Sequence, residues 1–265
     1  MKIIVCVKYV PDAQAGRRFE ADLTTDRAGV DGLLSELDEY AVEEALVVAD
    51  AIGATGERPQ VVVLTVGPED AAYAIKKSLQ MGADAGVHVD DPAIQGSDAV
   101  ATSRIVAAAI AAQSPDLVIT GMSSTDGGTG VVPAMIAQRL GLPQLTYAAE
   151  LTVDAAAGTV RIRRDGDTSV ETVEASLPAI VSVTDQINEP RYPSFKGIMS
   201  AKKKPVTRLS LADLGIPAEE VGLAAAWTRT VAAEPRPPKA AGTVITDDGT
   251  GGAQLVEYLV SHKLV

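Results

Sequence analysis

The fold class is decided by the stretch Gln60-Val61-Val62-Val63-Leu64-Thr65-Val66, which is followed at once by Gly67-Pro68-Glu69-Asp70. A continuous apolar run of this length is typical of a strand that is buried on both faces. The residues after it indicate a helix start, because proline suits the first turn and acidic side chains complement the positive end of the helix. The sequence therefore predicts a strand that leads directly into a helix, which ends at Met81-Gly82.

The same pattern recurs along the first two thirds of the chain. Strand-like apolar runs occupy residues 2–7, 86–89 and 116–120, and their spacing leaves room for a helix between neighbours. Helices are predicted from about Ser35 to Gly53 and from about Ser97 to Ala112. Such a series predicts an α/β fold with a doubly wound, mostly parallel sheet, whose ligand site lies beyond the carboxyl ends of the strands.

Ser35 stands three residues before Asp38, which predicts a start of the first helix similar to a capping box.

A glycine-rich segment that leads into another helix follows the run 116–120. It reads Gly121-Met122-Ser123-Ser124-Thr125-Asp126-Gly127-Gly128-Thr129-Gly130 and leads into a predicted helix over 131–140. Closely spaced glycines, hydroxyl groups and a helix amino terminus favour a phosphate site. The spacing matches neither the Walker A nor the Rossmann pattern, so a plain strand-to-helix connection stays open.

The last part of the chain changes character. Strand-like runs at 144–153, 159–164 and 170–183 are separated by turn residues and predict an added antiparallel region. The Pro-rich segment 234–239 predicts a stiff linker to a helix at 251–260. We therefore expect a nucleotide-binding α/β domain at 1–233, which includes a recognition loop at 188–204, and a linker with a C-terminal arm at 234–265.

Composition excludes several function classes. The 265 residues are 46% hydrophobic but only 3% aromatic, and the net charge of −12 disfavours nucleic acid and anionic membranes as partners. The single cysteine, Cys6, excludes a disulfide framework and predicts a reducing cytoplasm. Only two histidines are present, so a catalytic triad or a histidine-rich metal site is not expected. No apolar run is long enough for membrane insertion.

The segment 188–204 places an aromatic residue and a lysine cluster on this acidic chain. Pro190 and Pro193 restrict its backbone, and no apolar period is visible, which predicts a shaped loop. Phe195 has no periodic partner that could bury it. The segment is either a docking loop or a solvated connector whose lysines serve solubility.

Three parts of this segment carry a family resemblance: Asn188-Glu189-Pro190-Arg191-Tyr192, Gly197-Ile198-Met199 and Ala201-Lys202-Lys203-Lys204. They closely resemble the signature region of the electron transfer flavoprotein beta subunit. The resemblance covers nearly the whole chain and is also specific at residues 38–46 and 81–84. It implies a fold similar to that of the adenine nucleotide alpha hydrolases, and a subunit without catalytic residues of its own.

In this family the beta subunit binds AMP and supports an alpha subunit that holds the redox FAD. The resemblance thus implies a heterodimer that accepts electrons from flavin dehydrogenases, such as acyl-CoA dehydrogenases, and passes them to a membrane-bound electron transfer flavoprotein–quinone oxidoreductase. By position, it implies AMP contacts at Cys6, Ser35, Glu36, Leu37, Asp38, Val66, Gly121, Ser124, Thr125, Asp126, Gly127, Gly128, Thr129, Gly130, Val131 and Val132. It implies partner recognition by Arg191, Tyr192, Phe195, Lys196, Ile198, Met199, Lys202 and Lys203. Relatives usually carry Leu at the position of Phe195, which predicts a differently shaped partner pocket.

Two other functions stay open. The first is the beta subunit of an electron-bifurcating flavoprotein, in which a second FAD fills the pocket and NADH is oxidised. Those relatives usually read Thr-Ala-Gln-Val-Gly where this chain reads Thr129-Gly130-Val131-Val132-Pro133, and they tend to lack the cluster Lys202-Lys203-Lys204. The second is a stand-alone ATP-binding or ATP-hydrolysing domain of similar fold.

Overall fold

The computed structural model describes residues 1–234, 236–239, 242 and 244–265. It divides into one unit at Met1–Val231 and a second at Ala232–Val265. The second unit contains α7 (Gly251–Ser261), where the sequence predicts a helix. Pro235 in the predicted linker, and Ala240, Ala241 and Thr243 in the predicted arm, lie outside the described residues.

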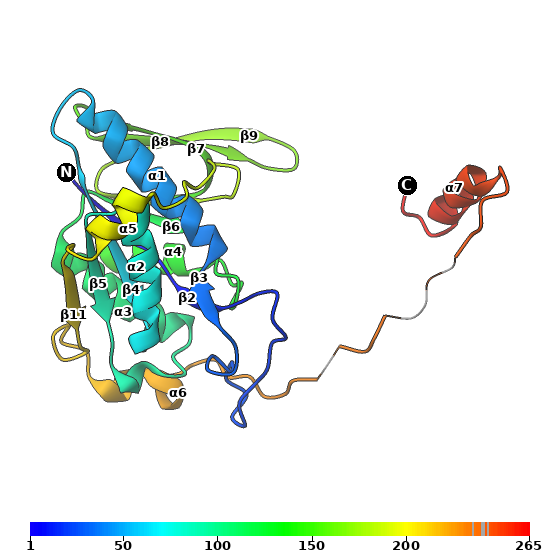
Figure 1. The fold of residues 1–265 in the computed structure, drawn as a ribbon, viewed down its shortest axis with the longest axis horizontal. Helices are drawn as coiled ribbons and strands as arrows, with labels where there is room; N and C mark the ends of the chain where they lie inside the picture. Colours follow the sequence, from blue (N-terminus) through cyan, green and yellow to red (C-terminus); the bar gives the residue numbers. More distant parts are fainter. Residues whose placement is uncertain (235, 240–241, 243) are drawn as a thin grey trace. The chain divides into compact units, whose positions relative to one another are not determined.

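A large sheet forms the centre of the first unit (Figure 1). Its strands are β1 (Lys2–Cys6), β4 (Gln60–Val66), β5 (Ala85–Val89), β6 (Leu117–Gly121), β7 (Gln144–Asp154), β8 (Thr159–Asp165), β9 (Val170–Ser176), β10 (Ala179–Val183) and β11 (Val206–Leu209). Within the described residues the sheet has nine strands, in the order β11-β5-β4-β1-β6-β10-β7-β8-β9. Pairing is parallel from β11 to β7, while β8 and β9 continue the sheet as an antiparallel meander. The predicted α/β fold is confirmed.

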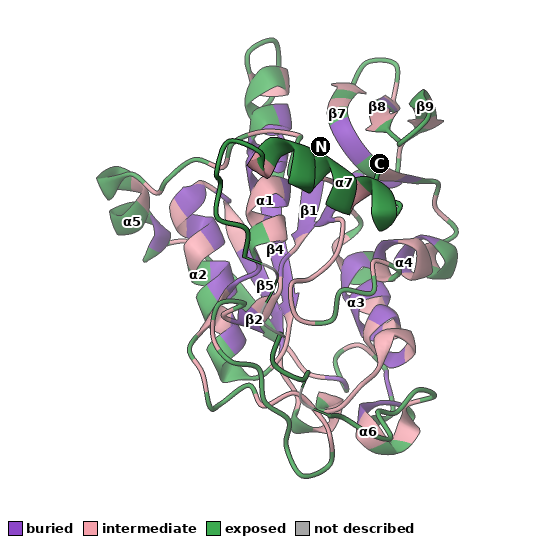
Figure 2. Ribbon diagram, turned by 90° about the vertical axis from the view of Figure 1, so that its right-hand side faces the viewer, coloured by how far each residue is buried: buried purple, intermediate pink, exposed green. Residues whose placement is uncertain are grey.

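Helices cover both faces of the parallel part of the sheet, as Figure 2 shows. The longer helices of the first unit are α1 (Glu36–Gly53), α2 (Ala72–Met81), α3 (Ala99–Gln113), α4 (Val132–Leu140) and α5 (Phe195–Ala201). Successive side chains of β1 point to opposite faces of the sheet. Ile3 and Val5 pack in the core with α1 and α2, and Ile4 packs in the core with α3 and α4. This alternation explains why the strand is apolar throughout, since neither face meets water.

Shorter elements complete the first unit. They are a small antiparallel pair, β2 (Tyr9–Pro11) with β3 (Gly32–Leu34), the helix α6 (Gly222–Ala225) and the 3-10 helices η1 (Glu69–Ala71), η2 (Pro92–Ile94) and η3 (Ala218–Glu220). The predicted start of the second helix is therefore the 3-10 turn η1, which leads into α2. Within the described part of the chain, no helix combines the length and apolar character that a membrane crossing requires.

The chain changes direction across the sheet at β1. It passes from β1 to β4 and β5 on one side, and then returns to β6 on the other side, so that Cys6 is paired with Leu64 and also with Thr120. In open α/β sheets, ligands bind at such a switch point, beyond the carboxyl ends of the strands. The topology thus points to the ends of β1, β4 and β6.

Three expectations from the sequence are wrong in detail. The run 170–183 is not one strand but two, because Pro178 lacks an amide donor and separates β9 from β10, which enters the parallel sheet between β6 and β7. The segment 188–204 is not a loop throughout, because the Ser194 side chain accepts a hydrogen bond from the Gly197 amide and caps α5. The hydroxyl of Ser35 makes no cap bond to α1, and the Asp38 carboxylate accepts a bond from the Lys8 amide instead.

Candidate functional site

A cavity of about 140 Å³ lies at the switch point. The ends of β1, β4 and β6 form one wall, and the loop after β6, α3 and the start of α4 form the other. Eight of the residues predicted to contact AMP line it: Cys6, Asp38, Val66, Gly121, Ser124, Thr129, Gly130 and Val132. The structure thus brings together segments that lie more than one hundred residues apart.

The other eight predicted contacts do not line this cavity. Ser35 and Leu37 lie at the start of α1, and Glu36 faces a separate groove. Thr125, Asp126, Gly127 and Gly128 lie in the loop after β6, and Val131 directly precedes α4.

Several lining residues were missed by the sequence prediction. They are Val7, Lys8, Leu64, Thr102, Val106, Thr120, Pro133 and Ile136, whereas Ser123 also lines the cavity and belongs to the predicted glycine-rich loop. Two signals in the sequence could have identified some of them. Lys8 is the first charged residue after β1, and Thr102 and Val106 are four residues apart, which places them on one face of α3.

Asp38 is the buried acid of the cavity. Its Oδ2 accepts a hydrogen bond of 2.8 Å from the Lys8 amide, and the Gly121 amide also donates to its side chain. Burial raises the pKa of Asp38 to about 7, although these two amides and the Lys8 charge oppose the shift. Burial, and then the neighbouring Asp38 charge, raise the pKa of Cys6 to about 12, so its thiol stays protonated and unreactive.

A charged network holds the loop beside the cavity. Asp126 accepts from the Lys8 Nζ at 2.8 Å and from Arg27 at 2.6 Å, and Arg17 donates to the carbonyls of Thr125 and Asp126. Burial alone would raise the pKa of Asp126, but Lys8 and Arg27 outweigh it and hold the pKa well below its usual range. The Asp126 side chain is only 5% exposed, so its carboxylate is shielded from water in the ion pair with Lys8.

The cavity also faces the amino end of α4. The first residues of a helix leave backbone amides without intrahelical partners, and Pro133 occupies one of these positions, where it needs no donor. Gly128 and Gly130 adopt positive φ angles of 62° and 65°, which glycine accepts without strain. Together with Lys8 and the Ser124 hydroxyl, these amides form a polar end that suits a phosphate.

The rest of the cavity wall suits a planar ring, because the side chains of Leu64, Val66, Val106 and Ile136 are apolar. Among the described residues there is no group of three or more histidine, cysteine, aspartate or glutamate side chains that could hold a metal ion. The arrangement can therefore bind a ligand that has an apolar ring at one end and a phosphate at the other.

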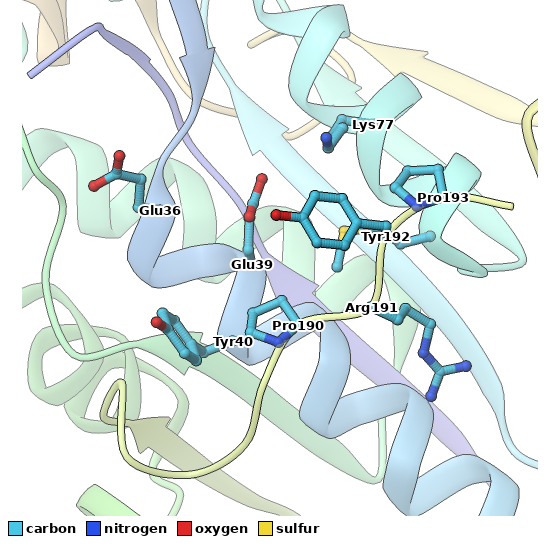
Figure 3. A pocket seen from close by; sticks show the side chains of 9 residues that line it. Glu36, Glu39, Tyr40, Lys77, Pro190, Arg191, Tyr192 and Pro193 are labelled. Carbon is cyan, nitrogen blue, oxygen red and sulfur yellow. The ribbon is translucent and has the colours of Figure 1, made fainter.

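A second hollow, of about 280 Å³, lies between α1, α2 and residues 190–193 (Figure 3). Its walls carry Glu36 and Glu39 from α1, Lys77 from α2 and Tyr192 from the segment. It is larger than the cavity, but none of its lining residues lies at the carboxyl ends of β1, β4 and β6, where the topology points to a ligand. The smaller cavity is therefore the better candidate for the ligand site.

The segment 188–204 presents an exposed apolar surface. Tyr192 is 92% exposed and Phe195 is 81% exposed, and Ile198 and Met199 of α5 are exposed beside them. The lysines of the predicted recognition set, Lys196, Lys202 and Lys203, are exposed as well.

Arg191 is different, because it pairs within the chain. Its guanidinium donates to both carboxylate oxygens of Glu43, at 2.7 and 2.9 Å, and its amide donates to the same carboxylate at 3.1 Å. Asn188 donates to Glu44 and to the Tyr40 carbonyl. These bonds fasten the segment to α1 just before α5.

Comparison with known proteins gives a consistent result. The family described as Electron transfer flavoprotein domain matches residues 22–214 of the chain. The chain is 48% identical to the electron transfer flavoprotein subunit beta of Mycobacterium tuberculosis (strain ATCC 25618 / H37Rv), with 99% of each chain covered. It is 30% identical to the electron transfer flavoprotein subunit beta of Megasphaera elsdenii over the whole of both chains. It is 35% identical to the caffeyl-CoA reductase-Etf complex subunit CarD of Acetobacterium woodii, with 98% and 97% covered.

Replacing Asp38 by Asn should change how stability depends on pH. Because the folded-state pKa is raised, protonated Asp38 contributes stability that is fully present below about pH 4 and is lost as the pH rises through about 7. The free energy of unfolding of wild type relative to Asp38→Asn should therefore fall by about 4 kcal/mol between pH 4 and pH 8. Urea unfolding at several pH values measures this difference. The exposed Asp185→Asn variant is the control, and a wild-type difference that stays constant with pH would contradict the assignment.

Replacing Arg191 by Gln should destabilise the fold by about 2 kcal/mol, because Glu43, whose side chain is 8% exposed, then loses its charged partner. The matched change Arg161→Gln removes an ion pair to Glu174 in which both side chains are exposed, and should cost about 0.5 kcal/mol or less. Equal losses in the two variants, measured by urea unfolding, would show that Glu43 does not depend on Arg191.

Proposed function

The chain belongs to the electron transfer flavoprotein family as a beta subunit, and we propose that it pairs with a FAD-bearing alpha subunit in a cytoplasmic, heterodimeric electron carrier. In this proposal the chain has no catalytic residues of its own. It binds AMP as a structural ligand, supports the alpha subunit and docks flavin dehydrogenases such as acyl-CoA dehydrogenases. The carrier then passes the electrons toward a quinone oxidoreductase.

The cavity at the switch point is the observation that carries the nucleotide part of this proposal. Its apolar wall suits the adenine ring, and its polar end offers Lys8, the Ser124 hydroxyl and the amides at the start of α4 to the phosphate. This combination of an apolar slot with a few convergent donors is typical of small-ligand sites. AMP combines such a ring with a single phosphate.

Counting the ligands of the purified complex tests this proposal. The chain is co-expressed with its alpha subunit, and FAD and AMP are released from the complex and quantified. We expect one FAD and one AMP for each heterodimer, and no flavin in the chain when it is expressed alone. Two FAD without AMP would replace the proposal by a bifurcating carrier. Hydrolysis of ATP by this chain alone would replace it by a stand-alone nucleotide hydrolase.

The exposed surface of α5 supports the docking part of the proposal. Phe195, Ile198 and Met199 form an apolar tip on a helix whose approach is fixed by the Arg191–Glu43 pair. Lys202 and Lys203 are exposed at the end of the same helix. An aromatic anchor with a charged rim is a common design of transient interfaces, in which the anchor supplies affinity and the charges steer the encounter.

Replacing Phe195 by Ala should lower the rate of electron transfer from the dehydrogenase by about tenfold or more at sub-saturating concentration, because a buried anchor contributes about 2 kcal/mol. FAD content and thermal stability should stay unchanged, since the side chain is 81% exposed. Stopped-flow reduction by the dehydrogenase measures the rate. Phe19→Ala is the matched control, because Phe19 is also exposed but lies outside the segment. Equal rates for wild type and Phe195→Ala would refute the anchor, and a loss of FAD would mark Phe195 as structural.

A further inference from the structure

The groove between α1, α2 and residues 190–193 is a hollow that the proposed function leaves without a role. Its volume of about 280 Å³ suits one long side chain better than a free small ligand, whose pockets usually reach about 300–1,000 Å³. Glu36, Glu39 and Lys77 line it, and across the described part of the chain none of these three belongs to an ion pair. Tyr40 and Tyr192 add aromatic rings to its walls (Figure 3). The groove therefore offers free charges and ring faces to a group from outside the chain.

The charges of the groove favour a cation. Two carboxylates and one ammonium group leave one negative charge, because Arg191, which also lines the groove, is already paired with Glu43. Glu39 is half-buried, and burial raises the pKa of its carboxyl, with Lys77 opposing the shift and Glu36 adding to it. A cation in the groove would stabilise the charged form that burial disfavours. A guanidinium also stacks on aromatic rings, so an arginine side chain matches both features.

The groove adjoins the apolar tip of α5. Tyr192 and Pro193 form part of its wall and stand directly before that helix, in which Phe195 is 81% exposed. The helix packs against α2, where a side chain at Gly197 would meet the Gln80 carbonyl, and α2 also forms one side of the groove. A partner that covers Phe195 is therefore close enough to place a long side chain in the groove.

We propose that the groove is a second contact site for the flavin dehydrogenase, and that it receives an arginine side chain of that partner. The two carboxylates bind the guanidinium, and the two tyrosine rings stack against it. The docking surface then carries negative charge before α5 and positive charge at its end, where Lys202 and Lys203 are exposed, with Phe195 between them. Such opposite charges fix the orientation in which a partner docks. This inference rests on the proposed docking function.

The test measures electron transfer from a reduced acyl-CoA dehydrogenase to the complex of the full chain with its alpha subunit. The dehydrogenase is one from which the wild-type complex accepts electrons, and stopped-flow rates are recorded at sub-saturating concentration and low ionic strength. Glu39→Gln should lower the second-order rate constant by about fivefold or more, because it removes the charge and keeps the shape. Lys77→Gln should raise it by about twofold or more, since Lys77 competes with the arginine of the partner. Both effects should shrink at high salt.

Each variant has a matched control. Lys76→Gln removes the same charge from the neighbouring position of α2, which is exposed but does not line the groove. Glu219→Gln removes an exposed carboxylate from η3. Both controls should keep the wild-type rate within about twofold, because exposed charges away from a contact are screened. FAD content and the midpoint of urea unfolding show whether each variant is folded. If Glu39→Gln does not fold, Glu36→Gln decides, since Glu36 is exposed and should also slow the transfer.

The outcomes separate this inference from the proposed function. An unchanged rate in the folded Glu39→Gln variant, or slower transfer in Lys77→Gln, overturns the inference. If Phe195→Ala still slows the transfer, the docking function then stays in place. Loss of the alpha subunit or of FAD from Glu39→Gln would mean that the groove contacts the alpha subunit, which also overturns the inference. A wild-type complex that accepts electrons from no acyl-CoA dehydrogenase overturns the inference and the docking part of the proposed function together.

Discussion

The arrangement of the site depends on Lys8, the second residue after the central strand β1. Its amide donates to Asp38 at the start of α1, its carbonyl accepts from the Ser35 amide, and its Nζ binds Asp126 in the loop after β6. One residue thus fastens two segments that approach the sheet from distant parts of the chain. Its bond to buried Asp38 has to form inside the fold, where an unpaired acceptor would be costly.

The segment 188–204 combines a fixed base with an exposed tip. The bidentate bond between Arg191 and Glu43 ties its beginning to α1, and the Lys204 Nζ donates to the Leu79 carbonyl at its end. Between these two points, Phe195 projects from the first turn of α5. A helix that is held at both ends presents its apolar tip with little loss of conformational entropy on binding, which is an advantage for a brief encounter with a partner.

The sequence predicts those parts of the fold that depend on local patterns. The apolar runs at β1, β4, β5 and β6 are readable because buried parallel strands need apolar side chains on both faces. The insertion of β10 between β6 and β7 is not readable, because strand order depends on long-range pairing. The short edge strand β11 was missed because its side chains are mostly exposed and show no alternation of apolar and polar residues. The helix α5 was missed because it is short and its only start signal is the Ser194 cap.

The candidate site divides in the same way. Its glycine-rich loop and the end of β4 could be located from the sequence, because the apolar runs that form β6 and β4 show where each strand ends. The role of Lys8 and its pairing with Asp126 could not be predicted, since the two residues lie 118 positions apart and meet only in the folded chain. Nothing in the local sequence distinguishes Asp126, which is paired with two cations, from an exposed loop acid.

The central claim is that the ends of β1, β4 and β6 and the start of α4 form a site for a nucleoside monophosphate. A crystal structure of the complex of this chain with its alpha subunit, grown with AMP, tests it most directly. We expect one AMP in the cavity, with its phosphate within hydrogen-bond distance of the amides at the start of α4 and of the Lys8 Nζ. AMP bound elsewhere on this chain, for example in the groove between α1, α2 and residues 190–193, with the cavity free of nucleotide, would contradict the account.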